Sequence, residues 1–163
     1  MAERPGQISD KKKKAMAKFE HSEDINASVG TVWSILTDPD QWLLWFPDVQ
    51  GASGPLAMQT GGTFQWQSGS KTGTGSLARV KPQHILQVIT KMDGRQATHT
   101  FEVNRHAGLF GGNGAQLHYT LEFHTAGGII GEFVAGGNPA DLLKVKNAVS
   151  KVHSLAERAA DPR

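Results

Sequence analysis

The sequence predicts an α+β fold in which a long C-terminal helix covers one apolar face of an antiparallel sheet. Two segments, 97–103 and 117–123, alternate between a mainly apolar row and a polar row, which is typical of strands with one buried face. Residues 139–159 instead place apolar side chains at helical spacing, namely Leu142, Val145, Val149, Val152 and Ala156. A sheet with one apolar face needs a cover, and this helix is long enough to provide it.

The first elements are a strand and two short helices. Residues 16–26 predict a strand, because alternate positions carry most of the apolar side chains. Ser28 is a good N-cap for a helix whose apolar residues follow at helical spacing: Val29, Val32, Trp33 and Leu36. Asp38 and Pro39 end that helix and begin a second short one, which Pro47 closes.

Strands separated by glycine fill the middle of the chain. Phe64 and Trp66 alternate with glutamines, and residues 73–81 and 84–92 form two further strands. The Asp-Gly pair that follows is a strong hairpin signal. About six strands therefore follow the short helices, and about seven are expected in all.

The two clearest strands predict a specific juxtaposition. If residues 105–115 close their hairpin symmetrically, Phe101 lies opposite Tyr119 and His99 lies opposite Leu121. His99 and Tyr119 then become diagonal neighbours on the inward face, about 7–8 Å apart along the backbone, which is within reach of long side chains.

Charge is distributed unevenly along the chain. The 17 basic and 15 acidic residues give a net charge of +2, but residues 1–14 hold five bases and two acids, or +3. The other 149 residues therefore carry 12 bases and 13 acids, or −1. A nearly neutral body is a poor candidate for nucleic-acid binding. We expect a flexible basic tail over residues 1–15 and one domain over 16–160.

Several site types are disfavoured. The 163 residues include no cysteine, which excludes disulfides and thiolate chemistry. His118 and His124 share the outward face but stand about 20 Å apart by strand rise, so no metal site is expected. The glycine groups in 108–137 lack the residues of a P-loop or a dinucleotide site, and no cofactor is expected.

Nothing in the sequence predicts stable membrane insertion. No apolar run approaches the roughly 18 residues that span a bilayer, and the N-terminus lacks a signal-peptide stretch. The run Lys11–Lys14 is consistent with a solvated tail, or with a patch for a membrane surface or nucleic acid. A cytoplasmic location is the expectation.

The order of elements and several local motifs resemble a known superfamily. The motifs are Ile25-Asn26-Ala27-Ser28, Val32-Trp33 and Leu36-Thr37-Asp38, followed by Trp42, Trp45 and Pro47. Over about residues 16–158 the chain resembles the helix-grip fold of the SRPBCC superfamily, which includes START domains and birch-pollen allergens, and it most resembles the polyketide cyclase/dehydrase-like branch. This resemblance implies a sheet curled around the long helix with an apolar cavity between them. The branch contains ligand carriers and cyclases.

The candidate site residues lie mainly on the inward strand rows. Histidine titrates near neutrality and tyrosine can donate to an enolate, so His99 and Tyr119 are candidates for acid–base catalysis. The alternative is that both are hydrogen-bonded core residues. Arg79 is a candidate anchor for a ligand carboxylate, and Phe133 lies in a glycine-flanked segment, 127–137, that is a candidate gate. The expected ligand contacts are Phe64, Trp66, Arg79, His99, Phe101, Tyr119 and Phe133.

The function expected from these observations is binding of a small hydrophobic or aromatic molecule in an internal cavity. A first alternative is a cyclase or dehydratase on a polyketide-like substrate, with His99 and Tyr119 as acid and base. A second is a protein-interaction module whose cavity is filled by side chains. The expected partner is a small hydrophobic ligand, not nucleic acid, and open sheet edges allow a homodimer.

Overall fold

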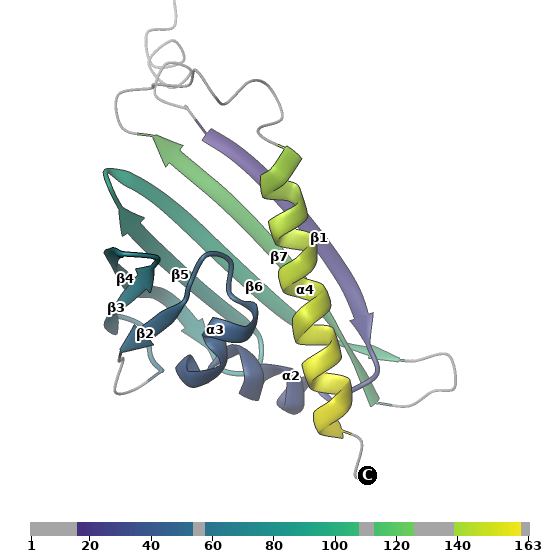
Figure 1. Cartoon of the computed structure of the whole chain (residues 1–163). Helices are drawn as coiled ribbons and strands as arrows, with labels where there is room; N and C mark the ends of the chain where they lie inside the picture. The colour runs from purple at the N-terminus through teal and green to yellow at the C-terminus, as the bar shows by residue number, and fades with distance from the viewer. Residues whose placement is uncertain (1–15, 54–57, 108–112, 126–138, 161–163) are drawn as a thin grey trace, which may run out of the picture.

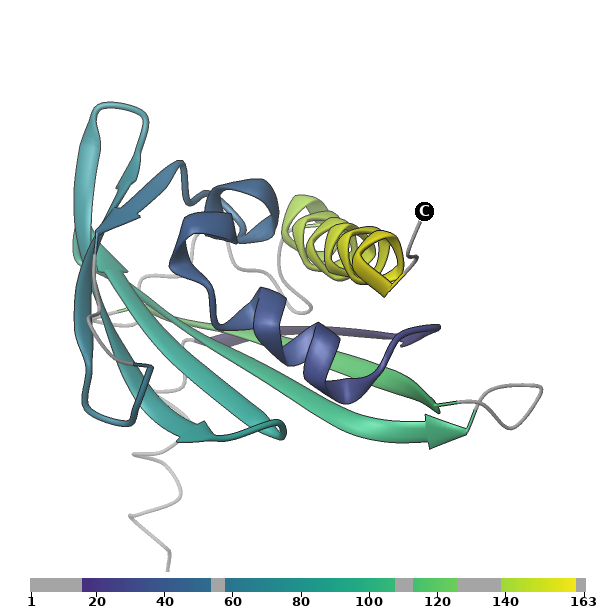
Figure 2. The ribbon, with the colours of Figure 1, turned by 90° about the horizontal axis from the view of Figure 1, so that it is seen from below.

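A seven-stranded antiparallel sheet carries the described helices on one side (Figures 1 and 2). The computed structural model describes residues 16–53, 58–107, 113–125 and 139–160. The strand order is β1-β7-β6-β5-β4-β3-β2. The elements are β1 (Met16–Ile25), α2 (Val29–Leu36), a 3-10 turn (Pro39–Gln41), α3 (Trp42–Trp45), β2 (Gly51–Ser53), β3 (Thr63–Ser68), β4 (Lys71–Lys81), β5 (Ile85–Met92), β6 (Arg95–Ala107), β7 (Asn113–Thr125) and α4 (Pro139–Ala160).

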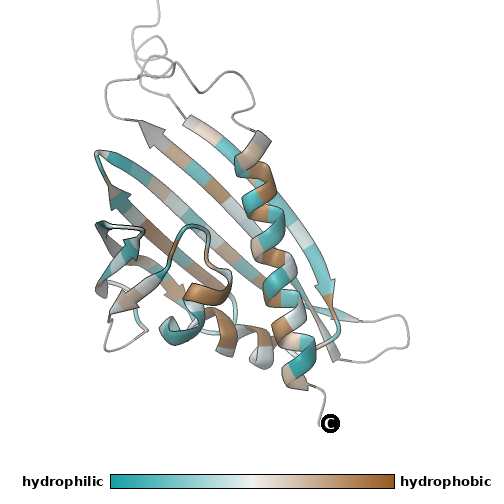
Figure 3. Ribbon diagram, in the orientation of Figure 1, coloured by the Kyte–Doolittle hydropathy of each residue, from teal (hydrophilic) through white to brown (hydrophobic). Residues whose placement is uncertain are grey.

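This architecture confirms the predicted fold. Figure 2 shows the sheet curving beneath α2, α3 and α4, with α4 running over β1 and β7. Figure 3 shows alternating hydrophobic and hydrophilic bands along the strands, as expected when one face packs against the helices. The predicted second short helix is a 3-10 turn followed by a single α-helical turn. None of the described helices is long and apolar enough to cross a membrane.

The short helices begin where their capping residues predict. The Ser28 hydroxyl accepts a hydrogen bond from the Thr31 backbone N–H at 3.1 Å, which confirms Ser28 as the N-cap of α2. The Asp38 carboxylate accepts from the Asp40 N–H at 3.1 Å and caps the 3-10 turn. These caps satisfy backbone donors that would otherwise have no partner at a helix start.

The hairpin of β6 and β7 has the predicted register. Phe101 lies opposite Tyr119 and His99 lies opposite Leu121. Both strands are longer than the alternation alone predicted, and residues 115–124 of β7 also pair with the whole length of β1. The predicted gate over 127–137 with Phe133, and the run Lys11–Lys14, lie outside the described residues.

Aromatic side chains fill the space between α3 and the sheet. Trp42 is fully buried, with its ring centroid 5.3 Å from that of Phe46 and 5.0 Å from that of Phe64. Trp45 packs edge-on against Phe101 at 5.2 Å. These contacts anchor α3 to the strands and fix the position of the loop that follows it.

Glycine on β4 is required where an aromatic ring from β3 lies flat on the sheet. A Cβ at Gly73 would lie 2.5 Å from the Lys91 carbonyl oxygen and 2.7 Å from the Trp66 ring. We expect Gly73→Ala to lower the free energy of unfolding by about 1–2 kcal/mol, because the Lys91 backbone cannot move aside cheaply. The matched control is Gly30→Ala in α2, where the nearest atom is 3.6 Å away. That substitution is expected to raise stability by about 0.5 kcal/mol. Urea denaturation of both variants checks the prediction, and equal effects would contradict it.

Candidate functional site

A cavity of about 560 Å³ opens on the concave side of the sheet. Its walls come from the loop after α3, from strands β3 to β7 and from the first turns of α4. Nine lining residues have largely apolar or ring-bearing side chains: Pro47, Val49, Trp66, Met92, Ala97, His99, Leu121, Phe123 and the methyl-bearing Thr90. The others are polar or charged: Asp48, Ser68, Lys71, Asp93, Arg95, Gln96, Asp141 and Lys144.

A chain of three buried polar side chains runs from the core to the cavity wall. The Tyr119 hydroxyl lies 2.7 Å from Nδ1 of His99, and Nε2 of His99 lies 3.0 Å from the Thr90 hydroxyl. Tyr119 is fully buried, whereas His99 and Thr90 line the cavity. Aromatic rings enclose the imidazole, with Phe46 at 4.7 Å and the Tyr119 ring at 6.0 Å between centroids.

Burial makes this chain electrically neutral. Burial lowers the pKa of His99 to about 3, so the imidazole is uncharged at neutral pH. Burial, together with the charge of Asp48, raises the pKa of Tyr119 well above its ordinary value. A base that works near neutrality needs a pKa close to the working pH. The pair is therefore arranged for hydrogen bonding rather than for proton transfer to bulk solvent.

Charged side chains surround the mouth of the cavity. Lys71 and Asp93 form an ion pair at 2.6 Å, and Lys144 contacts Asp48 at 3.0 Å. Asp48 has a backbone φ of 64°, a left-handed conformation that aspartate tolerates better than most residues. Burial raises the pKa of Asp141, with the charge of Asp48 adding to it and Lys144, 3.8 Å away, opposing it.

The structure separates the predicted ligand contacts into two groups. Trp66 and His99 line the cavity. Phe101 and Tyr119 face inward but lie behind its wall, since Phe101 is covered by Trp45 and Phe46. The His99–Tyr119 contact itself is confirmed, at hydrogen-bonding distance.

Arg79 does not face the cavity. A β-bulge between Leu77 and Arg79 shifts the register of β4 against β5, so Arg79 lies opposite Gln87 on the convex face and is exposed. One extra residue in a strand moves every following side chain to the other face.

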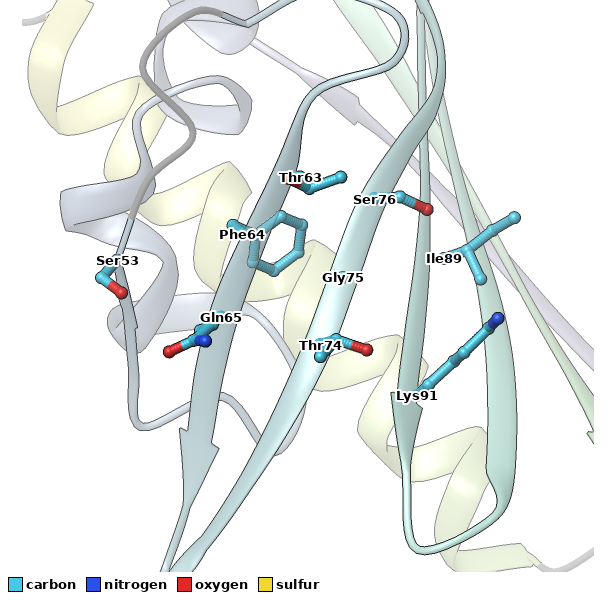
Figure 4. A pocket seen from close by; sticks show the side chains of 9 residues that line it. All are labelled: Ser53, Thr63, Phe64, Gln65, Thr74, Gly75, Ser76, Ile89 and Lys91. Carbon is cyan, nitrogen blue, oxygen red and sulfur yellow. The ribbon is translucent and has the colours of Figure 1, made fainter.

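Phe64 lines a different hollow, of about 570 Å³, at the β2–β5 end of the sheet (Figure 4). Its ring lies against Gly75 on the neighbouring strand. Most of the other lining residues are polar and alternate with the buried positions of their strands: Thr63, Gln65, Thr74, Ser76 and Lys91. Phe64 therefore belongs to the core beneath this outer surface and not to the wall of the cavity that contains His99.

Sequence reasoning missed Thr90, although a signal for it existed. Leu86, Val88 and Thr90 occupy one parity of β5, and all three are buried. Thr90 is thus the inward residue at the end of a clear strand, next to the predicted His99. No group of three histidine and carboxylate side chains that could hold a metal ion occurs within 16–53, 58–107, 113–125 and 139–160.

Solved structures share this fold. The Zhui aromatase/cyclase from Streptomyces sp. R1128 matches with a TM-score of 0.66 and 18% identity, over 90% of this chain and 97% of that one. Truncated norcoclaurine synthase from Thalictrum flavum matches with a TM-score of 0.59 and 13% identity, over 84% and 92%.

A third structure, DynU16 from the dynemicin biosynthetic locus, gives a TM-score of 0.63 and 19% identity over 88% of this chain. The chain spans 48% of the length of that protein. At these identities the likeness concerns the fold alone. No curated protein matches the sequence.

The whole sheet and most of α4 lie within the match to one known family. Residues 16–153 match the family described as "Polyketide cyclase / dehydrase and lipid transport". The chain belongs to this family, in the polyketide cyclase-like branch of the SRPBCC superfamily.

Proposed function

We propose that the protein binds a small hydrophobic or aromatic molecule in the cavity between the sheet and α4. The observation that carries this proposal is an open space of about 560 Å³ whose walls are about half apolar, with a neutral, buried chain of hydrogen-bonded side chains at one side. Ligand pockets typically have a volume of about 300–1,000 Å³ and contain a few well-placed polar groups. An open space of this size also argues against a function in which side chains fill the cavity.

Binding is favoured over cyclase or dehydratase catalysis. The His99–Tyr119 hydrogen bond and the likeness to an aromatase/cyclase fold are the observations that support catalysis. However, both ring nitrogens of His99 already have protein partners, and Tyr119 does not line the cavity. An imidazole with a pKa of about 3 is also a weak base. We therefore assign these residues to orientation of a ligand.

A cavity-filling substitution tests the proposal. Ala97 lines the cavity from β6, whereas its neighbour Thr98 points to the opposite face. We expect Ala97→Phe to weaken binding of the naphthyl ketone Prodan at least about tenfold, because the added ring occupies the ligand's space. Thr98→Phe is the matched control and is expected to leave the affinity within about twofold. Fluorescence titration measures the Prodan affinity of both variants. Mass spectrometry of whatever co-purifies with the native protein identifies its own ligand. Unchanged binding by the Ala97 variant would place the probe elsewhere and refute the proposal.

A further inference from the structure

The burial of Tyr119 and the position of Thr90 on the cavity wall determine which way the hydrogen bonds of the Tyr119–His99–Thr90 chain run. A neutral imidazole has one N–H donor and one acceptor nitrogen, so two arrangements are possible. In the first, the Tyr119 hydroxyl donates to Nδ1 of His99 and Nε2–H donates to the Thr90 hydroxyl. In the second, Nδ1–H of His99 donates to the Tyr119 hydroxyl oxygen and the Thr90 hydroxyl donates to Nε2. The distances of 2.7 Å to Tyr119 and 3.0 Å to Thr90 fit either direction.

The two arrangements differ in which hydrogen is left without an acceptor. The second arrangement leaves the hydroxyl hydrogen of Tyr119 without an acceptor, because His99 is the partner of that hydroxyl among the described residues and is then the donor. Tyr119 has 0% exposure, so water cannot accept this hydrogen instead. A buried donor without an acceptor is costly. The first arrangement instead leaves the hydroxyl hydrogen of Thr90, which lines the cavity. The first is therefore favoured.

We propose that the Thr90 hydroxyl is a buried hydrogen-bond donor that the cavity offers to its ligand, held in that role by the buried Tyr119 and His99. This inference rests on the proposed ligand-binding function and adds a chemical class to it. The preferred ligand carries an acceptor oxygen, as in a ketone, quinone or phenolate, attached to an apolar or aromatic body. Thr90 determines specificity, and His99 and Tyr119 are positioning residues that act through it.

Two probes of one shape test this donor. Prodan carries a ketone in its side chain. The ketone-free probe is its propyl analogue, which has a methylene group in place of that carbonyl. We expect Thr90→Val to weaken Prodan binding about five- to tenfold and to shift its bound emission to shorter wavelength, because one hydrogen bond to the carbonyl is lost. The ketone-free probe should change by less than about twofold. Thr90→Ser retains the hydroxyl and should bind both probes as the native protein does.

The outcomes separate this inference from the proposed function. Equal weakening of both probes by Thr90→Val, or no change in either, overturns the donor role while the cavity still binds. Stronger native binding of the ketone-free probe than of Prodan also overturns it. Binding of neither probe by the native protein counts against the cavity function itself.

A measurement without any ligand tests the same arrangement. Long-range proton–nitrogen NMR correlation of the native protein is expected to place the imidazole proton of His99 on Nε2, with Nδ1 unprotonated. A proton on Nδ1 would reverse the chain and overturn the inference. Tyr119→Phe removes the donor to Nδ1 and is expected to weaken this tautomer preference, so the imidazole signals should become a mixture of the two forms.

Discussion

Trp42→Ala is expected to lower the free energy of unfolding by about 3–5 kcal/mol, the range for removing a large buried aromatic side chain. Trp42 is fully buried between Phe46 and Phe64, and its Nε1–H donates to the Leu36 carbonyl at 2.9 Å. The indole thus connects the end of α2, the single turn of α3 and the sheet. Urea denaturation followed by circular dichroism measures the change.

The neighbouring Trp45 provides the control for the polar part of this effect. Trp45 is similarly buried, but its Nε1 has no hydrogen-bond partner among the described residues. Trp42→Phe and Trp45→Phe remove similar volumes, but only the first takes a donor away from a buried carbonyl. Trp42→Phe should therefore cost about 1–3 kcal/mol more than Trp45→Phe. Equal costs would show that the bond to Leu36 contributes nothing.

Trp42→Ala should also affect ligand binding in the cavity. Phe46, which follows α3, packs against the His99 imidazole at 4.7 Å, and the next three residues form part of the cavity wall. Loss of the Trp42 anchor is expected to loosen this wall and weaken Prodan binding in the folded variant. The cavity is therefore supported by packing that lies outside its own lining.

The pairing of β6 with β7 could be predicted because two simple rules determine it. Alternation identifies the inward residues, and a symmetric hairpin fixes which of them lie opposite each other. Together they place His99 beside Tyr119, and the structure confirms that contact. The caps of the short helices were predictable for a similar reason, since Ser28 and Asp38 act on backbone groups only two or three residues away.

The extent of the cavity could not be predicted, because alternation shows which side chains face inward but not which remain uncovered. Phe101 and Tyr119 face inward, yet Trp45 and Phe46, more than 50 positions earlier in the chain, pack over Phe101. Such long-range packing leaves no local pattern. The position of Arg79 was unpredictable for another reason, since the bulge beside it contains no glycine to mark it.

A second large effect is expected at a polar cluster that joins β1 to α4. The Glu23 carboxylate accepts hydrogen bonds from Nδ1 of His153 at 2.6 Å, from the Ser150 hydroxyl at 2.9 Å and from Nε2 of His21 at 2.9 Å. On the other side of the His153 imidazole, Nε2 donates to the Glu157 carboxylate at 2.8 Å. Protonated histidine supplies both N–H donors at once, so the cluster is complete only while His153 is charged.

Glu23→Gln is expected to lower the free energy of unfolding by about 2–3 kcal/mol near pH 6, because hydrogen bonds to a charged acceptor are among the stronger ones. The matched control is Glu20→Gln, also on β1, whose carboxylate contacts His118 at 2.9 Å on the exposed face. An exposed pair contributes about 0–1 kcal/mol. Urea denaturation of both variants measures the difference.

The pH dependence follows from the directions of the pKa shifts. Burial works to lower the pKa of His153, but its bonds to Glu23 and Glu157 outweigh it, so the pKa is raised above 6.5. The stabilisation that charged His153 contributes is fully present below about pH 6.5, and it is lost as the pH rises through the higher pKa of His153 in the folded protein. For Glu23, burial is outweighed by the bonds from His153, His21 and Ser150, so its pKa is lowered below 4.5. That contribution is present above about pH 4.5 and is lost as the pH falls through the lower folded value.

The stability difference between the native protein and Glu23→Gln should therefore be largest between about pH 4.5 and 6.5 and should shrink above that window. Neutral His153 retains one N–H, so it can donate to Glu23 or to Glu157 but no longer to both. Because this cluster holds the C-terminal half of α4 on β1, its loss should loosen the helix that covers the sheet. A difference that stays constant from about pH 5 to about pH 9 would show that His153 does not bridge the two carboxylates in its charged form.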